Sequence, residues 1–230
     1  MQHKSFKERV KEIAINQSKL YKQIFVDYEY LICSPAFSSK KFYIINGKEE
    51  NYLHLLGINS SLSALDFFEK CYNGTLKEDD FDFIKRRQSE KSVQGSVRRK
   101  IKVLPNIMNI FSQDKEILVE ENFKKNKVFC NFATSDGNYT LGFINTSKAY
   151  PKTLISGNNL DESNSNKVEL ILRKKGKDEK FNTIILGNED LIEKYSEIKF
   201  ILDEKLLNIK SNPQNDETKE VAITEDDKNK

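Results

Sequence analysis

The sequence has few of the residues from which nucleotide-binding and cofactor-binding loops are built. Only nine glycines occur among its 230 residues, and they are not grouped as a phosphate-binding loop requires. A serine-centred nucleophile elbow is also missing. These absences argue against a kinase, a dinucleotide-dependent dehydrogenase and an elbow-type hydrolase, and we expect no cofactor.

Cysteine is equally scarce. The three cysteines, Cys33, Cys71 and Cys130, are far apart, and none has the close cysteine or histidine spacing of a zinc site. The sequence therefore disfavours a zinc protein, and we predict no metal site. Free thiols of this kind are typical of a reducing cytoplasm.

Long apolar runs are missing as well. No window approaches the roughly 20 apolar residues that a membrane-spanning helix needs. The first residues are charged and no apolar run follows them. We therefore expect neither a signal peptide nor a membrane partner, and we predict a cytoplasmic protein.

Charge is nearly balanced over the whole chain but unevenly distributed along it. The 38 basic and 35 acidic residues give a formal net charge of +3. Residues 211–230 contain six acidic residues and three lysines, so the rest of the chain is more basic than the total suggests. We predict that residues 211–230 form a disordered acidic tail.

Helical patterns are strongest in the first half of the chain. Apolar residues recur at helical spacing near the N-terminus, and Ser63 is a typical N-cap for a helix that Asn73-Gly74 would end. A basic segment that turns apolar, interrupted by Pro105, predicts a further helix. The predicted helices lie within residues 1–27, 63–73, 98–111 and 188–210, the last as a closing helix.

Strand patterns follow in the second half of the chain. Asp136-Gly137 predicts a hairpin turn, because Asp-Gly pairs readily adopt the positive φ angles that tight hairpin turns need. Several antiparallel strands after a run of helices indicate an α+β protein. The predicted strands lie at residues 28–33, 41–45, 128–133, 139–144, 167–173 and 181–186.

His54 stands on a short apolar stretch, Asn51–Ile58, that a glycine interrupts. A helical segment here would bury Tyr52, Leu55 and Leu56, and Gly57 would close it. Such a histidine is partly desolvated and titrates near neutrality. A lone histidine beside an apolar stripe is more commonly a structural residue, so this stretch alone does not establish a site.

The strongest charge feature is a run of eight cations opposed only by Glu90 between residues 85 and 102. Such a run is usually a solvated face, but it is also a plausible phosphate-attracting surface. The cations are Lys85, Arg86, Arg87, Lys91, Arg98, Arg99, Lys100 and Lys102.

Metal-independent RNA cleavage needs parts that this sequence contains. A base takes the proton of the 2′-hydroxyl, cations stabilise the phosphorane, and an acid protonates the leaving 5′-oxygen. His54 could serve as base or acid. Arg98, Arg99 or Lys100 could hold the phosphate, and Lys152 or Thr153 could bond a non-bridging oxygen.

The chain also resembles the fourth group of the phage Barnase/EndoU/Colicin/RelE-like nuclease domains, over roughly residues 28–187. Its most specific piece is the His54–Gly57 stretch. The other matching pieces are Phe67-Phe68-Glu69-Lys70-Cys71-Tyr72-Asn73-Gly74-Thr75-Leu76, the basic helix near Lys100, Leu141-Gly142-Phe143 and Pro151-Lys152-Thr153-Leu154.

The resemblance implies N-terminal helices packed on a small antiparallel sheet, and RNA cleavage without a metal. It divides the chain into an N-terminal helix (1–27), a nuclease domain (28–187), the closing helix (188–210) and the tail. It points to His54, Lys100 and Thr153 as catalytic residues. The residues expected to bind RNA are Lys85, Arg86, Arg87, Arg98, Arg99, Lys102 and Lys152.

Three functions stay open at this point. The first is a small endoribonuclease, for instance a toxin with an antitoxin partner. The second is an inert phage or mobile-element protein that kept the fold and binds a host protein or nucleic acid. The third, a DNA-binding regulator, fits Arg98 and Arg99 only loosely because no helix-turn-helix spacing precedes them.

Overall fold

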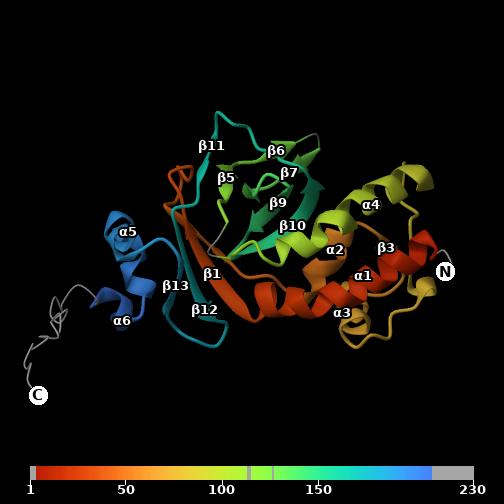
Figure 1. Ribbon diagram of the computed structural model, residues 1–230, viewed down its shortest axis with the longest axis horizontal. Coiled ribbons are helices and arrows are strands. Elements are labelled where there is room, and N and C mark those ends of the chain that lie inside the picture. Colours follow the sequence, from red (N-terminus) through yellow and green to blue (C-terminus); the bar gives the residue numbers. More distant parts are fainter. Residues whose placement is uncertain (1–3, 113–114, 126, 209–230) are drawn as a thin grey trace, which may run out of the picture.

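The computed structural model describes residues 4–112, 115–125 and 127–208, which form an α+β protein (Figure 1). The predicted acidic tail lies outside the described residues. One large sheet crosses the middle of the molecule. Its strands are β1 (Tyr28–Cys33), β2 (Phe42–Ile45), β5 (Leu118–Glu121), β8 (Phe132–Ser135), β9 (Tyr139–Asn145), β10 (Ala149–Ser156), β11 (Ser165–Lys167), β12 (Leu170–Lys175) and β13 (Thr183–Leu186).

The predicted α+β class is confirmed, but the prediction of a small antiparallel sheet is wrong. The nine strands are ordered β11-β5-β8-β9-β10-β2-β1-β12-β13, and one junction is parallel, where Ala149 of β10 pairs with Ile45 of β2. The sequence prediction missed β5 and β11 because they are short and partly polar. Two further pairs stand apart from this sheet: β3 (Asn59–Ser60) with β4 (Phe81–Asp82), and β6 (Lys124–Lys125) with β7 (Val128–Phe129).

Strand β1 has buried side chains on both of its faces. Tyr30 and Ile32 belong to the main hydrophobic core, whereas Leu31 and Cys33 belong to a second core on the opposite face of the sheet. Because successive side chains of a strand point to opposite faces, a nearly continuous apolar run is what a covered central strand requires. The predicted boundaries of this strand are confirmed.

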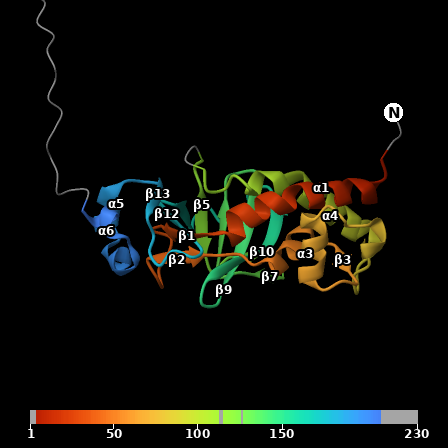
Figure 2. The ribbon, with the colours of Figure 1, turned by 90° about the horizontal axis from the view of Figure 1, so that it is seen from below.

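Helices cover the main core at one end of the molecule (Figures 1 and 2). Helix α1 continues into a π-helical turn, and Ser63 caps α3 by accepting a hydrogen bond from the Asp66 amide at 3.1 Å, as predicted. The helical segments at this end are α1 (Phe6–Tyr21), η1 (Lys22–Val26), η2 (Glu49–Asn51), α2 (Tyr52–Leu56), α3 (Ala64–Tyr72), η3 (Glu78–Asp80) and α4 (Glu90–Ile107).

Helix α4 begins earlier than the predicted helix at residues 98–111. The side chain of Ser89 caps it by accepting a hydrogen bond from the Ser92 amide at 3.3 Å. Only two residues of its first turns, Val93 and Val97, are buried and apolar, so the sequence pattern predicted a start that is too late. Pro105 falls within the last turn, and the helix ends two residues later.

The second core is covered by three short helical segments at the end of the molecule opposite α4 (Figure 2). They are α5 (Glu189–Lys194), η4 (Ser196–Ile201) and α6 (Glu204–Leu207). The single closing helix predicted over residues 188–210 is therefore wrong. Tyr195 leaves the helical conformation with φ −105° and ψ 50°, which separates the first two segments. Among the described residues, no helix is both long and apolar enough to cross a membrane.

Candidate active site

His54 is held at the surface by a short helix, three of whose other four residues are buried. Tyr52, Leu55 and Leu56 of α2 are fully buried, and the Tyr52 hydroxyl donates to the carbonyl oxygen of Ala14 at 2.7 Å. This anchors α2 to α1 and leaves the His54 side chain exposed to solvent. Gly57 ends the helix with φ +74°, as the sequence predicted.

Lys100 reaches the end of α2 from α4. Its position on α4 shares a helix face with the buried residues Val97 and Leu104, because residues three and four apart lie on one face. The Lys100 ammonium donates to the carbonyl oxygen of His54 at 3.2 Å. Burial, and then the charge of Lys85, lowers the pKa of Lys100 to about 8.

The third part of the site is an irregularity in β10, which packs against both α2 and α4. Pro151 pairs with Phe143 and Thr153 with Gly142, so Lys152 is an extra residue in a β-bulge. The buried positions of the strand shift accordingly, from Pro151 to Leu154. Lys152 is exposed and Thr153 is half-buried at this point.

Lys85 begins a tight turn that precedes α4. The Gln88 amide donates to the Lys85 carbonyl oxygen at 3.2 Å, and Arg86 and Arg87 occupy the tip of the turn. Arg87 has the left-handed backbone conformation, with φ 64°. Both arginines are exposed, whereas Lys85 is half-buried and burial lowers its pKa.

Three lysines supply the charges that act on the imidazole. Partial burial lowers the pKa of His54, and the nearby charges of Lys152, Lys100 and Lys85 lower it further. Within the part of the chain that the structure describes, none of these three lysines forms an ion pair with a carboxylate. We call His54, Lys85, Lys100 and Lys152 the cationic cluster. It is a place where an anion would be strongly favoured.

The structure thus gathers some of the predicted site residues and separates others. Lys102 and Arg98 lie two positions from Lys100 and therefore leave α4 on other sides. Arg98 stacks on Phe6 of α1, with its guanidinium carbon 4.8 Å from the ring centroid. Arg99 is exposed, as Arg98 and Lys102 are.

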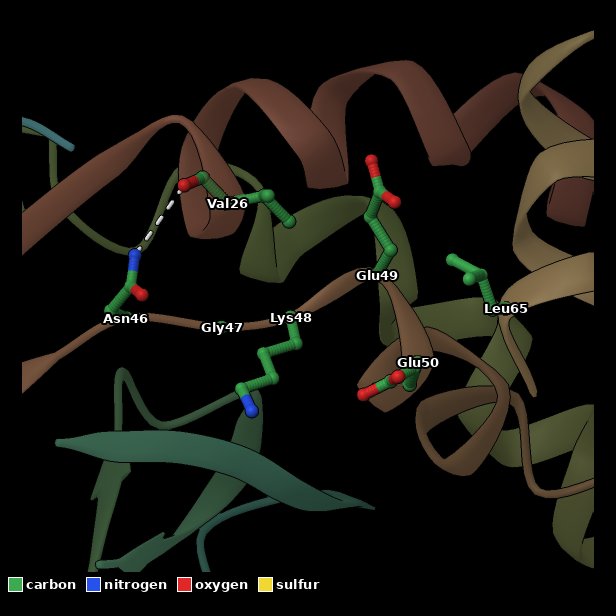
Figure 3. Close-up of a pocket in the computed structure, with 7 residues that line it drawn as sticks. All are labelled: Val26, Asn46, Gly47, Lys48, Glu49, Glu50 and Leu65. Carbon is green, nitrogen blue, oxygen red and sulfur yellow. Dashed lines mark hydrogen bonds between the residues drawn. The ribbon is translucent and has the colours of Figure 1, made fainter. Parts of the chain in front are cut away.

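A hollow lies elsewhere, at the start of η2 (Figure 3). Its volume is about 500 Å³, and none of its lining residues belongs to the cationic cluster. Glu49 and Glu50 line it, so its charge does not suit a phosphate. The lining residues are Val26, Asn46, Gly47, Lys48, Glu49, Glu50 and Leu65.

Two contacts of the site were not foreseen from the sequence. A side-chain carbon on Gly57 would lie 2.9 Å from Cδ of Lys100, so the absence of a side chain there makes room for the lysine. A side-chain carbon on Gly142 would lie 2.6 Å from Sγ of Cys130 and 2.9 Å from the Thr153 methyl group. In the sequence, Gly57 was interpreted only as the end of a helix, and nothing near Gly142 indicated its contact with Cys130 and Thr153.

Metal ligands do not gather in the described ranges: no group of three or more His, Cys, Asp or Glu side chains there could hold a metal ion. All three cysteines are buried and free, as predicted.

The fold and the cluster together define an α+β protein with a histidine on which the charges of three lysines act. The chain matches the family model described as phage-Barnase-EndoU-ColicinE5/D-RelE like nuclease4 over residues 13–228. It therefore belongs to this family of nucleases, which confirms the resemblance seen in the sequence. A search of curated proteins and a search of solved structures each found no match.

Proposed function

We propose that the protein is an endoribonuclease that cleaves RNA without a metal, by attack of the 2′-hydroxyl on the adjacent phosphate. The observation that carries this proposal is the environment of His54. Three lysines that form no ion pair with a carboxylate among the described residues act on an imidazole whose pKa is lowered, in a member of a nuclease family. A neutral imidazole at pH 7 can accept a proton, and the lysines can stabilise the charge that develops on the phosphorane.

The roles follow from position. His54 takes the proton of the 2′-hydroxyl, and Lys100, which reaches the end of α2 from α4, faces the phosphate. Water protonates the 5′-oxygen as it leaves. Thr153 and Lys152, at the bulge of β10, bond a non-bridging oxygen and hold the neighbouring phosphate. Lys85 adds charge from the turn before α4, and Arg86, Arg87, Arg98, Arg99 and Lys102 attract the RNA over a wider surface.

The biological setting that fits such an activity is a toxin of a phage or mobile element, acting in the cytoplasm and restrained by an antitoxin or a host protein. RNA is then the substrate. This setting rests on the family and on the proposed chemistry.

The test is cleavage of a mixed pool of tRNA and messenger RNA in EDTA, by wild type and His54→Ala. Lys205→Ala serves as a charge control because Lys205 is exposed on α6, in the second core's helical layer. We expect 2′,3′-cyclic phosphate ends from wild type and from the control, and their loss with His54→Ala. If wild type leaves RNA intact, the proposal fails and the inert binding protein replaces it; a parallel incubation with DNA separates ribonuclease from general nuclease activity.

A further inference from the structure

The β6–β7 hairpin presents an exposed aromatic ring among lysines. Phe129 keeps 60% of its surface exposed, although large apolar side chains are normally covered. Lys124, Lys125 and Lys127 are also exposed on this hairpin. No acidic residue occurs from position 122 to position 135, so the charge of these lysines is not offset by neighbours in the sequence.

The hairpin is joined directly to the site at the β10 bulge. Phe129 precedes Cys130, whose thiol and the Thr153 methyl group both lie against Gly142. Burial raises the pKa of the Cys130 thiol to about 11, although the charge of Lys152 acts in the opposite direction. The charge of Lys152 also acts on His54, so Lys152 connects the Cys130 end of the hairpin electrostatically with the cationic cluster.

The ring is suited to stacking. The Lys124 ammonium lies 5.1 Å from the centroid of the Phe129 ring and occupies one face of it. The antiparallel pairing of Lys124 with Phe129 holds this arrangement in place. Exposed aromatic rings beside lysines are how proteins bind single-stranded nucleic acid, because each base can stack while the cations follow the phosphates.

We propose that Phe129 stacks on an unpaired base of the RNA next to the phosphate held by the cationic cluster, and that Lys124, Lys125 and Lys127 contact the flanking backbone. The substrate class is then single-stranded RNA, since a paired base is already stacked within its duplex and has no free face. This inference rests on the proposed function and adds the choice of substrate to it.

The test measures binding separately from cleavage. The probe is a fluorescent single-stranded RNA whose 2′-hydroxyls are all O-methylated, so that it cannot be cut, with its duplex for comparison. Stacking on an aromatic ring changes affinity by roughly tenfold or more when the ring is removed. We therefore expect Phe129→Ala to raise the Kd of the single strand about tenfold, and Phe129→Trp to retain the affinity of wild type.

Phe200→Ala is the matched control, because Phe200 is 72% exposed on η4 in the helical layer over the second core. We expect it to bind as wild type does. Equal Kd values for Phe129→Ala and Phe200→Ala would overturn the inference, and so would wild-type binding of the duplex as tight as that of the single strand. The proposed function is tested by a different experiment, and its failure would be seen as no cleavage of unmodified RNA by wild type.

Discussion

Lys100 crosses the Cα atom of Gly57 so closely that a side chain there would lie 2.9 Å from its Cδ and 3.0 Å from its Nζ. The glycine thus has two tasks. It ends α2 in a left-handed conformation, and it leaves the space in which the lysine reaches the His54 carbonyl oxygen.

Comparing an alanine substitution at Gly57 with one at Gly74 separates the effect of backbone strain from the effect on Lys100. Gly57→Ala is strained at φ +74° and also pushes the end of Lys100 aside, which a flexible side chain can accommodate. Gly74→Ala is the matched control, with φ +72° and no atom within 4 Å of the added carbon. Both variants should lose about 1 to 2 kcal/mol of unfolding free energy from backbone strain.

Only Gly57→Ala should lower kcat/KM for RNA, by about tenfold or more, because it moves a group that stabilises the transition state. Urea unfolding and steady-state cleavage measure the two effects. Equal activity of the two variants would show that the position of Lys100 does not matter to the reaction.

The pH dependence of kcat/KM should be bell-shaped. His54 must be neutral to accept a proton, and its pKa is lowered, so the rate should rise with pH at values below the usual histidine range of about 6.5. Lys100 must be charged, so the rate should fall above pH 8, as the lysine loses its proton. A pH profile from 4 to 10, measured at substrate concentrations below KM, tests both limbs.

Lys100→Arg identifies the source of the alkaline limb. A guanidinium stays charged throughout this range, so the fall near pH 8 should move to higher pH even if the maximal rate is lower. The rise of the rate at acidic pH, which depends on His54, should stay where it is in wild type. An alkaline limb that stays in place would assign it to another group.

A buried ion network next to β1 should contribute strongly to stability. Glu29 is 4% exposed and pairs with Lys148 and, at 3.5 Å, with Lys174, whose side chain is 11% exposed. Glu29→Met leaves the Lys174 charge without its carboxylate partner, with only the carbonyl oxygens of Asp178 and Glu179 as hydrogen-bond acceptors, and should cost about 3 kcal/mol. The double variant Glu29→Met/Lys174→Met should recover part of this loss in urea unfolding, and purely additive losses would contradict the coupling.

Glu121 should make the protein sensitive to acid. Partial burial by itself would raise the pKa of its carboxyl, but hydrogen bonds from Ser38, Ser39 and Tyr43 outweigh it and lower the pKa from 4.5 to about 2. The carboxylate therefore contributes stability above pH 4.5, and this contribution is lost as the pH falls toward 2.

Glu121→Gln should therefore lower the unfolding free energy by about 1 to 2 kcal/mol at pH 7, since the site is partly screened by solvent. The difference from wild type should shrink near pH 2. Urea unfolding of both proteins at pH 7 and at pH 2 measures this difference. If the difference is the same at both pH values, the hydrogen bonds do not depend on the charge of Glu121.

Local signals in the sequence predicted local structure well. The boundaries of β1, the cap at Ser63, the end of α2 at Gly57 and the turn at Asp136-Gly137 each depend on a few neighbouring residues. Gly137 has φ +90°, the conformation for which a glycine in a turn is suited.

Long-range pairing was not predictable in the same way. The parallel junction at Ala149 depends on where the whole sheet curls, and no residue near it signals a partner in β2. Within the site, the sequence named His54, Lys85, Lys100 and Lys152 but did not show that the charges of the three lysines act on the imidazole. Which cations face the imidazole depends on the register of α4 against β10, and that is decided by packing of the apolar residues between them.

The two covered faces of β1 have a consequence for how the chain folds. Its first partner, β2, follows within a few residues, but the other, β12, begins only at Leu170, which pairs with Cys33. Pairings between residues so distant in sequence are slow to form. During synthesis, this apolar strand near the N-terminus has one edge unpaired until most of the chain has been made, and an unpaired strand edge of this kind is prone to aggregation.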